Sequence, residues 1–183
     1  MKSFPILTTD RLILRNFTLA DAPEVKRMAG DVAVAMNTLN MPHPYVNGVA
    51  EEWINSLAGE FNSESSIVFA ITLKESRSLI GAIGLTLKLQ FRNAEMGYWL
   101  GKEYWNKGYT TEAAIAVIQY AFNNLPVHKI SANHFHDNLA SGKVMLKAGM
   151  HYEGIQKEHI WHWNTYKHLL NYAIFNPNNI KDQ

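Results

Sequence analysis

Apolar and polar positions along this chain change their spacing several times, and each change predicts a new element. RLILRNF near the start alternates apolar side chains as a strand does, and TLADAPEVKRMAG after it has the character of a helix. Thr18 is a candidate N-cap for that helix, with Asp21 three residues later as its capping partner. NTLNMPHPYVNG is rich in Asn, Pro and Gly, so we expect a loop there that forms one wall of a cleft.

Helical spacing returns in VAEEWINSLAGEF, where Val49, Trp53, Leu57 and Phe61 share one face. Three β-rich runs follow, namely SIVFAITL, SLIGAIGLTLKL and NAEMGYWL, and only the short polar stretches KESRS and QFRN separate them. Connections of this length are typical of hairpins, so we expect an antiparallel meander.

The spacing changes again at Thr110, where apolar residues recur every three or four positions, as in a helix that packs one face on a sheet. These apolar residues are Ala114, Val117, Ile118, Ala121, Phe122 and Leu125. KISANHF then has the pattern of a strand, and NLASGKVMLKAGM that of a second helix ending at Gly149. The strands EGIQKEHIWHW and YKHLLNYAIF close the chain around a turn at Asn164 and Thr165.

The order of these elements is strand, two helices, three strands, helix, strand, helix and two strands. That order predicts an α/β (α+β) protein with a mixed sheet and helices packed on it. No repeat or linker interrupts the pattern, and 183 residues with 47% hydrophobic side chains are enough for one sizeable core. We therefore expect a single domain over residues 1–183. Three consecutive strands argue against a nucleotide-binding fold that alternates strands and helices throughout.

Composition narrows the class of partner. Lys and Arg total 17 against 16 Asp and Glu, and no run of like charges follows the chain, so binding to nucleic acid is not expected. The absence of cysteine excludes disulfides and thiolate metal sites, and the start, MKSFPILTTDRL, lacks the apolar core of a signal peptide. No stretch approaches the ~18 consecutive apolar residues of a membrane span. We expect a cytoplasmic protein without a membrane partner, and assembly as a homodimer is left open.

The junction EYWNKGYTTEAA, at residues 103–114, joins the strand NAEMGYWL to the next helix. The first N–H groups of a helix lack intrahelical partners, and with the aligned peptide dipoles they attract an anion such as a pyrophosphate. Gly108 would let the backbone approach a phosphate closely, and Lys107 would add positive charge at the rim. The alternative is that Gly108 serves only a tight turn and that Lys107 is a solvated side chain.

Three segments carry a resemblance to a known family. The opening TTDRLILRNFTLADA, the centre AEMGYWLGKEYWNKGYTTEA and the later NLASGKVMLKAGM have the order and spacing of the GNAT acyltransferase superfamily. From roughly Thr8 to Phe175 the chain resembles its branch of ribosomal-protein N-terminal acetyltransferases. The resemblance implies a mixed, mostly antiparallel seven-stranded sheet flanked by about four helices, with splayed central strands that hold acetyl-CoA. It also implies acetyl-CoA as co-substrate and no metal.

The resemblance implies a cofactor site at the junction. The family's phosphate loop begins with Gln or Arg, continues to Gly and ends with Gly or Ala, and here those slots hold Trp105, Gly108 and Thr110. Trp is usual for this branch in the first slot, whereas Asn106 stands where the branch usually has Gly. Met96 and Gly97 are candidates to present a backbone N–H to the thioester oxygen. The residues expected to contact the cofactor are Met96, Gly97, Trp105, Asn106, Lys107, Gly108, Tyr109, Thr110, Thr111, Asn138 and Lys147.

Acetyl transfer to an amine needs a neutral nucleophile, a polarised thioester carbonyl and a proton for the departing thiolate. The resemblance implies Glu95 as the base, and a carboxylate paired with Arg92 or a lysine is the alternative. Many family members have a Tyr that acts as the general acid where this chain has Met145. This branch instead has a Ser at the position of Ser141, so the resemblance implies Ser141 as the candidate acid. Asn138 lies on the same helical face and would bind the pantetheine. The alternative for Ser141 is a hydroxyl that bonds the backbone of its own helix, and the alternative for Asn138 is a plain helix cap.

Aromatic residues near the expected cleft are candidates for substrate contact, although such side chains are more often core or interface: Tyr45, Trp53 and Trp161. His134, His136 and His168 are weighed as auxiliary bases or substrate contacts, because no third ligand is spaced for a metal. The predicted function is an acetyl-CoA-dependent N-acetyltransferase acting on a primary amine, either a protein N-terminus or a small amine or amino acid. The alternative is a non-catalytic module that binds acyl-CoA.

Overall fold

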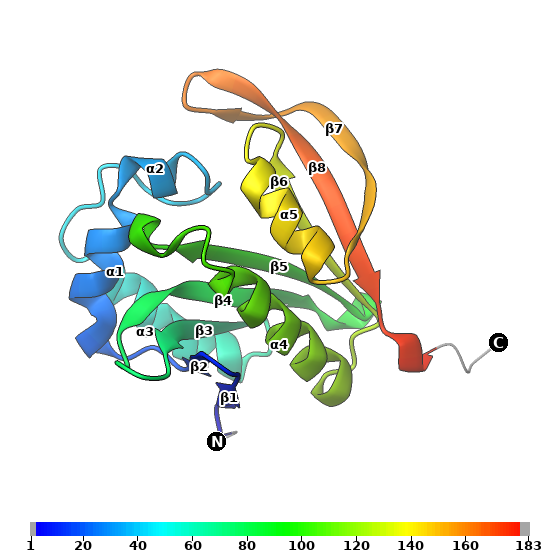
Figure 1. Ribbon diagram of the computed structural model, residues 1–183, viewed down its shortest axis with the longest axis horizontal. Coiled ribbons are helices and arrows are strands. Elements are labelled where there is room, and N and C mark those ends of the chain that lie inside the picture. The colour runs from blue at the N-terminus through cyan, green and yellow to red at the C-terminus, as the bar shows by residue number, and fades with distance from the viewer. Residues whose placement is uncertain (1–2, 180–183) are drawn as a thin grey trace.

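A computed structural model describes residues 3–179 of the chain (Figure 1). One eight-stranded sheet runs through it in the order β1-β2-β3-β4-β5-β6-β8-β7. Neighbouring strands are antiparallel except for β5 and β6, which run parallel. The mixed, mostly antiparallel sheet and the meander of three central strands are therefore confirmed.

The elements follow the predicted order. The strands are β1 Leu7–Thr8, β2 Leu12–Arg15, β3 Ser66–Leu73, β4 Leu79–Lys88, β5 Asn93–Leu100, β6 Lys129–Phe135, β7 His151–His162 and β8 Thr165–Phe175. The α-helices are α1 Ala22–Ala29, α2 Val32–Ala35, α3 Val49–Asn62, α4 Tyr109–Asn124 and α5 Leu139–Lys147. Short 3₁₀ turns lie at Leu19–Asp21, Leu89–Phe91, Lys102–Tyr104 and Pro177–Asn179.

Two short elements raise the count above the expected seven strands and about four helices. β1 has two residues, and α2 is a single turn whose N-cap, Asp31, accepts a hydrogen bond from the Ala33 N–H at 2.8 Å. Elements of this length hold too few residues to display a period. The final turn also differs, because it lies at Trp163 and Asn164, one residue earlier than expected. Both have a positive φ, 50° and 58°, as a tight two-residue hairpin turn requires.

Thr18 and Asp21 form the predicted capping arrangement at the 3₁₀ turn before α1. The Thr18 N–H donates to the Asp21 carboxylate at 2.8 Å, and the guanidinium of Arg15 donates to both oxygens of that carboxylate at 2.8 Å. Burial alone would raise the pKa of Asp21, but these hydrogen bonds outweigh it and lower the pKa. The end of β2 is thereby tied to the start of the first helix.

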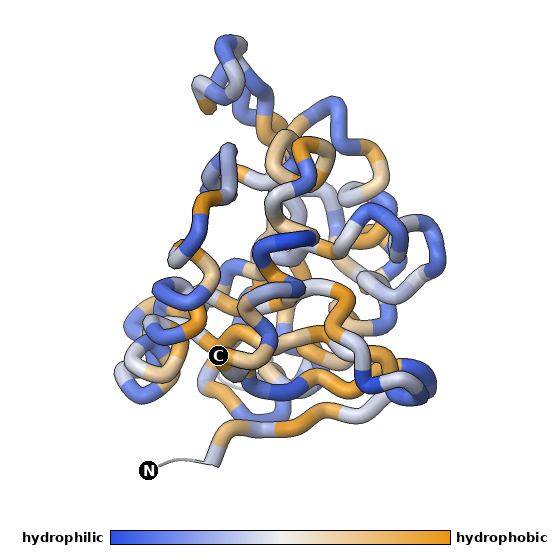
Figure 2. Tube along the Cα trace, turned by 90° about the vertical axis from the view of Figure 1, so that its left-hand side faces the viewer, coloured by the Kyte–Doolittle hydropathy of each residue, from blue (hydrophilic) through white to orange (hydrophobic). Residues whose placement is uncertain are grey.

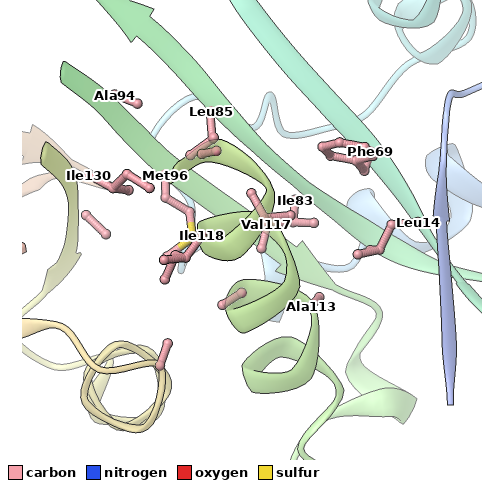
Figure 3. Packing of buried hydrophobic residues seen from close by; sticks show 14 of the residues in the cluster. Leu14, Phe69, Ile83, Leu85, Ala94, Met96, Ala113, Val117, Ile118 and Ile130 are labelled. Atoms are coloured by element: carbon pink, nitrogen blue, oxygen red, sulfur yellow. The ribbon is translucent and has the colours of Figure 1, made fainter. Parts of the chain in front are cut away.

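Helices cover both faces of the sheet. In Figure 1, α4 and α5 lie in front of the strands and α3 lies behind them. Figure 3 shows Val117 and Ile118 of α4 pointing toward the sheet, where Ile83, Leu85 and Met96 meet them. On the opposite face a second cluster packs α1 and α3 against β3 and β4. Residues of β5 that alternate along the strand contact opposite clusters, with Met96 and Tyr98 in the first and Trp99 in the second.

The centre of the sheet opens between β5 and β6. These parallel strands pair only at Asn93, Ala94 and Glu95 of β5, and from Met96 to Leu100 β5 has no partner strand on that side within the described part of the chain. The splayed strands implied by the resemblance are therefore confirmed, and the gap begins immediately after Glu95.

The last hairpin extends away from the body of the protein (Figure 1). β7 is exposed along most of its length, but the hairpin tip returns to the molecule, where the ring of Trp163 lies 5.3 Å from that of His43. Figure 2 shows hydrophobic stretches running through the interior while hydrophilic stretches gather at the outer turns. Within residues 3–179, no helix is both long and apolar enough to cross a membrane.

Candidate active site

Two cavities open onto the gap between β5 and β6. The larger has a volume of about 690 Å³ and is lined by the loop at residues 37–45, by α3 and by the central strands. The smaller, of about 420 Å³, is lined by the junction before α4 and by the first turns of α5. Tyr98, Trp99 and Ser141 line both cavities, so the two meet at the splayed strands.

The smaller cavity contains most of the residues predicted to contact the cofactor: Trp105, Asn106, Gly108, Tyr109, Thr110, Thr111, Asn138 and Lys147. Asn106 and Gly108 have positive φ values of 59° and 81°, in the left-handed region that Gly and Asn tolerate best. That requirement explains why Asn can stand where the branch usually has Gly. Gly108 is the N-cap of α4, so the free N–H groups of the first helical turn follow it directly.

The charge of the smaller cavity suits an anion. Among the described residues, its only charged lining residues are Lys143 and Lys147, both exposed on α5. Lys107, predicted to add charge at the rim, is not among the lining residues, and its ammonium lies 5.7 Å from the centre of the Tyr104 ring. Lys143 takes the place in the cavity that the sequence pattern assigned to Lys107.

A hydrogen-bond network fixes the junction to the start of the chain. Glu112, in the first turn of α4, accepts from the Thr9 hydroxyl at 2.6 Å and from Nε of Arg11 at 2.7 Å. The Arg11 guanidinium also donates to the Lys107 carbonyl at 2.9 Å. Burial would raise the pKa of Glu112, but the hydrogen bonds from Thr9 and Arg11 outweigh it and lower the pKa. The opening motif TTDRL thus holds the junction from outside the cavity.

Asn138 and Ser141 begin α5 beside the gap. The Asn138 side chain caps the helix, because its oxygen accepts a hydrogen bond from the Ser141 N–H at 3.2 Å. Asn138 also lines the smaller cavity, so it acts as a helix cap and lies at the expected cofactor site. The Ser141 hydroxyl does not bond its own helix. Instead it lies 2.8 Å from the Tyr98 hydroxyl, which also donates to the Ser141 carbonyl at 3.0 Å. Burial raises the pKa of Tyr98 to about 12, and the hydrogen bond with Ser141 offsets this only in part.

Glu95 lies on the larger cavity, together with Met96 and Gly97. Its carboxylate accepts a hydrogen bond from the Asn133 amide at 3.0 Å and forms no salt bridge with Arg92 or a lysine within the described part of the chain. Glu95 and Tyr98 belong to opposite faces of β5, and both reach the gap because no strand fills it. The candidate base and the Tyr98–Ser141 pair therefore approach the same gap from two sides.

His134 is buried at the larger cavity, with 5% of its surface exposed. Its Nδ1 lies 2.7 Å from the Phe135 carbonyl, which can only accept, so in the neutral ring Nδ1 carries the proton and Nε2 keeps a lone pair. No residue within 3–179 forms a hydrogen bond with Nε2. A Cβ on Gly142 of α5 would lie 2.6 Å from Nε2, so the helix can approach His134 only because that residue is glycine.

The predicted substrate contacts divide. Tyr45 and Trp53 line the larger cavity, whereas Trp161 lines neither cavity and is 60% exposed, packed edge-on against Tyr166 in the last hairpin. His136 and His168 contact each other outside both cavities. Over residues 3–179, no three His, Asp or Glu side chains are grouped as metal ligands would be.

Four residues that line the cavities were not predicted from the sequence: Glu52, Tyr98, Asn133 and Lys143. A usable signal existed for Tyr98, because it follows Glu95 on the same strand and has a polar end that a buried position must satisfy. Asn133 and Glu52 lie far from Glu95 in the chain, so only the assembled sheet brings them to the cavity.

Known proteins share this architecture. Residues 11–151 match the family model of the acetyltransferase (GNAT) domain. The chain is 31% identical over 176 residues, covering 95% of it and 98% of the relative, to the uncharacterized N-acetyltransferase YoaA of Bacillus subtilis. It is 27% identical over 166 residues, 84% and 82% of the two chains, to the ribosomal protein uS5 alanine N-acetyltransferase of Escherichia coli.

A solved structure shares the fold. RimL, a ribosomal L7/L12 alpha-N-protein acetyltransferase in complex with coenzyme A, superposes with a TM-score of 0.86 at 15% identity, over 93% of this chain and 98% of that one. Both the sheet with its splayed centre and the family match over most of the sequence agree with this likeness. The chain belongs to the GNAT family of N-acetyltransferases.

Proposed function

We propose that the protein transfers the acetyl group of acetyl-CoA to a primary amine by direct attack of the amine on the thioester. The observation that carries the proposal is the meeting of two cavities at the gap in the sheet, with the Tyr98–Ser141 hydrogen bond at their junction. A donor in the smaller cavity and an amine in the larger one would bring thioester carbon and amine nitrogen together there.

The pyrophosphate of acetyl-CoA would bind at the N-terminus of α4. Backbone N–H groups between Asn106 and Thr111 are the donors, and Lys143 and Lys147 supply positive charge from α5. The pantetheine would then run past Asn138 toward Ser141, with the thioester carbonyl near the unpaired edge of β5 at Met96 and Gly97. The coenzyme A bound to RimL supports this donor.

The attack requires a neutral amine. The neutral nitrogen attacks the thioester carbon, and Glu95, held by Asn133, would accept the proton that this nitrogen loses as the C–N bond forms, directly or through one water. An α-amino group, with a pKa of about 7.7–8.0, needs little help at neutral pH, whereas an alkylamine with a pKa near 10.4 needs more. The C–S bond then breaks and leaves the coenzyme A thiolate.

Ser141 and Tyr98 would protonate the thiolate. The raised pKa of Tyr98, about 12, keeps the phenol protonated at neutral pH, so that its proton, turned from the Ser141 carbonyl, can be donated to the Ser141 hydroxyl oxygen. Ser141 passes its proton to the sulfur, Tyr98 reprotonates Ser141, and solvent restores the phenol once the products leave. This adds Tyr98 to the pair of catalytic residues that the sequence predicts.

The proposal is tested by following free coenzyme A while the protein and acetyl-CoA are mixed with a panel of primary amines and N-terminal peptides. We expect turnover with at least one acceptor, and Ser141→Ala should lower kcat by roughly 10²-fold while changing acetyl-CoA affinity much less. Unchanged kcat in that variant would remove Ser141 from the mechanism. Tight acetyl-CoA binding without turnover on any acceptor would instead favour the non-catalytic acyl-CoA-binding module.

A further inference from the structure

We infer that the acceptor is a small polycationic amine, a diamine or polyamine without a carboxylate group. The inference rests on the proposed function and specifies the acceptor that the larger cavity selects. It comes from the charge, the hydrogen-bonding groups and the size of that cavity.

The two cavities differ in the sign of their charge. The charged residues among the described lining of the larger cavity are Glu52 and Glu95, with no Lys or Arg, whereas the smaller cavity has Lys143 and Lys147 and no acid. An amino acid acceptor would bring its carboxylate into a cavity that has two carboxylates and no cation to pair with it. Burying such a charge unpaired is unfavourable, so the cavity discriminates against it.

Glu52 provides a site for a second cation. It comes from α3, on a different element from Glu95, and its carboxylate has no hydrogen bond or ion pair with any described residue. Glu95 is the proposed base for the reacting nitrogen, so Glu52 is free to bind a second ammonium. Trp53 and Tyr45 add aromatic surface to the same cavity, which favours a cation further.

His134 forms part of the wall of the larger cavity but offers no group to a ligand there. It is almost completely buried, and its Nε2 has no partner among the described residues. Nε2 lies against Gly142 of α5, where a Cβ would be 2.6 Å away, and it has no exposed surface that a ligand could reach. The cavity therefore presents carboxylate acceptors from two elements, α3 and β5, to a ligand rich in N–H donors.

The size of the larger cavity favours a small molecule over a protein N-terminus. Its volume of about 690 Å³ lies within the range of roughly 300–1,000 Å³ that is typical of small-molecule sites. The loop at residues 37–45 forms one wall, and the contact between His43 and Trp163 joins that loop to the tip of the last hairpin.

The test compares three acceptors of equal chain length: 1,4-diaminobutane, butylamine and 4-aminobutanoate, each with saturating acetyl-CoA. Because 1,4-diaminobutane has two equivalent amines, it is favoured about twofold over butylamine on statistical grounds alone, and one exposed ion pair should raise the ratio of kcat/KM further, up to about tenfold, with 4-aminobutanoate the poorest acceptor. Glu52→Gln should bring the ratio of 1,4-diaminobutane to butylamine close to two. Glu51→Gln removes the same charge one residue away on α3, outside the cavity, and should keep the ratio.

Each contrary result has a distinct meaning. A preference for 1,4-diaminobutane over butylamine no larger than the statistical one, or a larger kcat/KM for an N-terminal peptide, would overturn the inference while the acetyltransferase proposal stands. If no acceptor is turned over, the proposed function fails, and calorimetric titration of 1,4-diaminobutane into the coenzyme A complex becomes the test. Binding that Glu52→Gln weakens and Glu51→Gln does not would then support the polycation site, and no binding would overturn it.

Discussion

Gly108→Val is the sharpest test of the junction before α4. Gly108 has a φ of 81°, and a Cβ there would lie 3.4 Å from the Arg11 guanidinium, an ordinary contact, so the substitution acts through backbone strain. A side chain in the left-handed region costs roughly 1–2 kcal/mol, and more when it is β-branched. In a domain of this size each kcal/mol lowers the Tm by about 2–4 °C, so a loss of roughly 2–8 °C is expected.

The effect on the cofactor should be larger than the effect on stability. If the junction relaxes by rotating its peptide groups, at least one N–H turns away from the pyrophosphate. One hydrogen bond to a charged group contributes about 1.5–3 kcal/mol, which corresponds to a rise of about 10- to 150-fold in the Kd of coenzyme A. Isothermal titration calorimetry measures this Kd, and thermal unfolding measures the Tm.

Gly48→Val is the matched control, because Gly48 is the N-cap of α3, has a φ of 91°, and a Cβ there would meet no described atom within 4 Å. It should lower the Tm by a similar amount and leave the Kd of coenzyme A unchanged. If the Gly108→Val protein is folded and its Kd for coenzyme A is unchanged, the junction only turns the chain and does not bind the cofactor. Equal weakening in both variants would mean that the loss of affinity follows from general destabilisation.

Three further results are expected. Tyr98→Phe removes the partner of the Ser141 hydroxyl and should lower kcat by about tenfold or more at unchanged Kd for coenzyme A; a parallel loss of affinity would mean that Tyr98 only shapes the cavity. Asn106→Gly keeps the left-handed backbone and should leave that Kd within about twofold, whereas Asn106→Val should raise it, and calorimetry distinguishes the two. Asp21 and Glu112 have lowered pKa values because hydrogen bonds outweigh burial, which alone would raise them. Their contribution to stability is therefore complete above the unfolded pKa values of about 3.9 and 4.3 and is lost as the pH falls through the lower folded values. Glu112→Gln should reduce this acid-side loss in urea unfolding, and an unchanged pH dependence would contradict the role of its network.

Long elements with a regular period were predictable from the sequence. The buried face of α4 is the one that the spacing of Ala114, Val117 and Ala121 predicts, and the three-stranded meander follows from short polar connections. The junction was predictable because a strand, a glycine and a helix follow one another there. In each case the information lies within a few consecutive residues.

Contacts between distant segments were not predictable. Arg11 and Glu112 are separated by 101 positions, and neither has a local pattern that reveals the other. Trp161 has the composition of a substrate contact, but its hairpin extends beyond the sheet, so it lies outside both cavities. Tyr98 illustrates a further limit, since strand alternation assigns it to the face opposite Glu95, and only the opening of the sheet lets both reach one point.

The opening between β5 and β6 also has a mechanical meaning. Among the described residues, only three residue pairs join β5 to β6, so the two halves of the sheet share few backbone hydrogen bonds and are held together mainly by the core around α4 and α5. Without ligand, amide hydrogen exchange should separate β6, β7 and β8 from the rest of the sheet as a less protected unit. A cofactor that contacts both α4 and α5 would connect the two halves of the sheet, so its binding should make the whole sheet unfold as one cooperative unit.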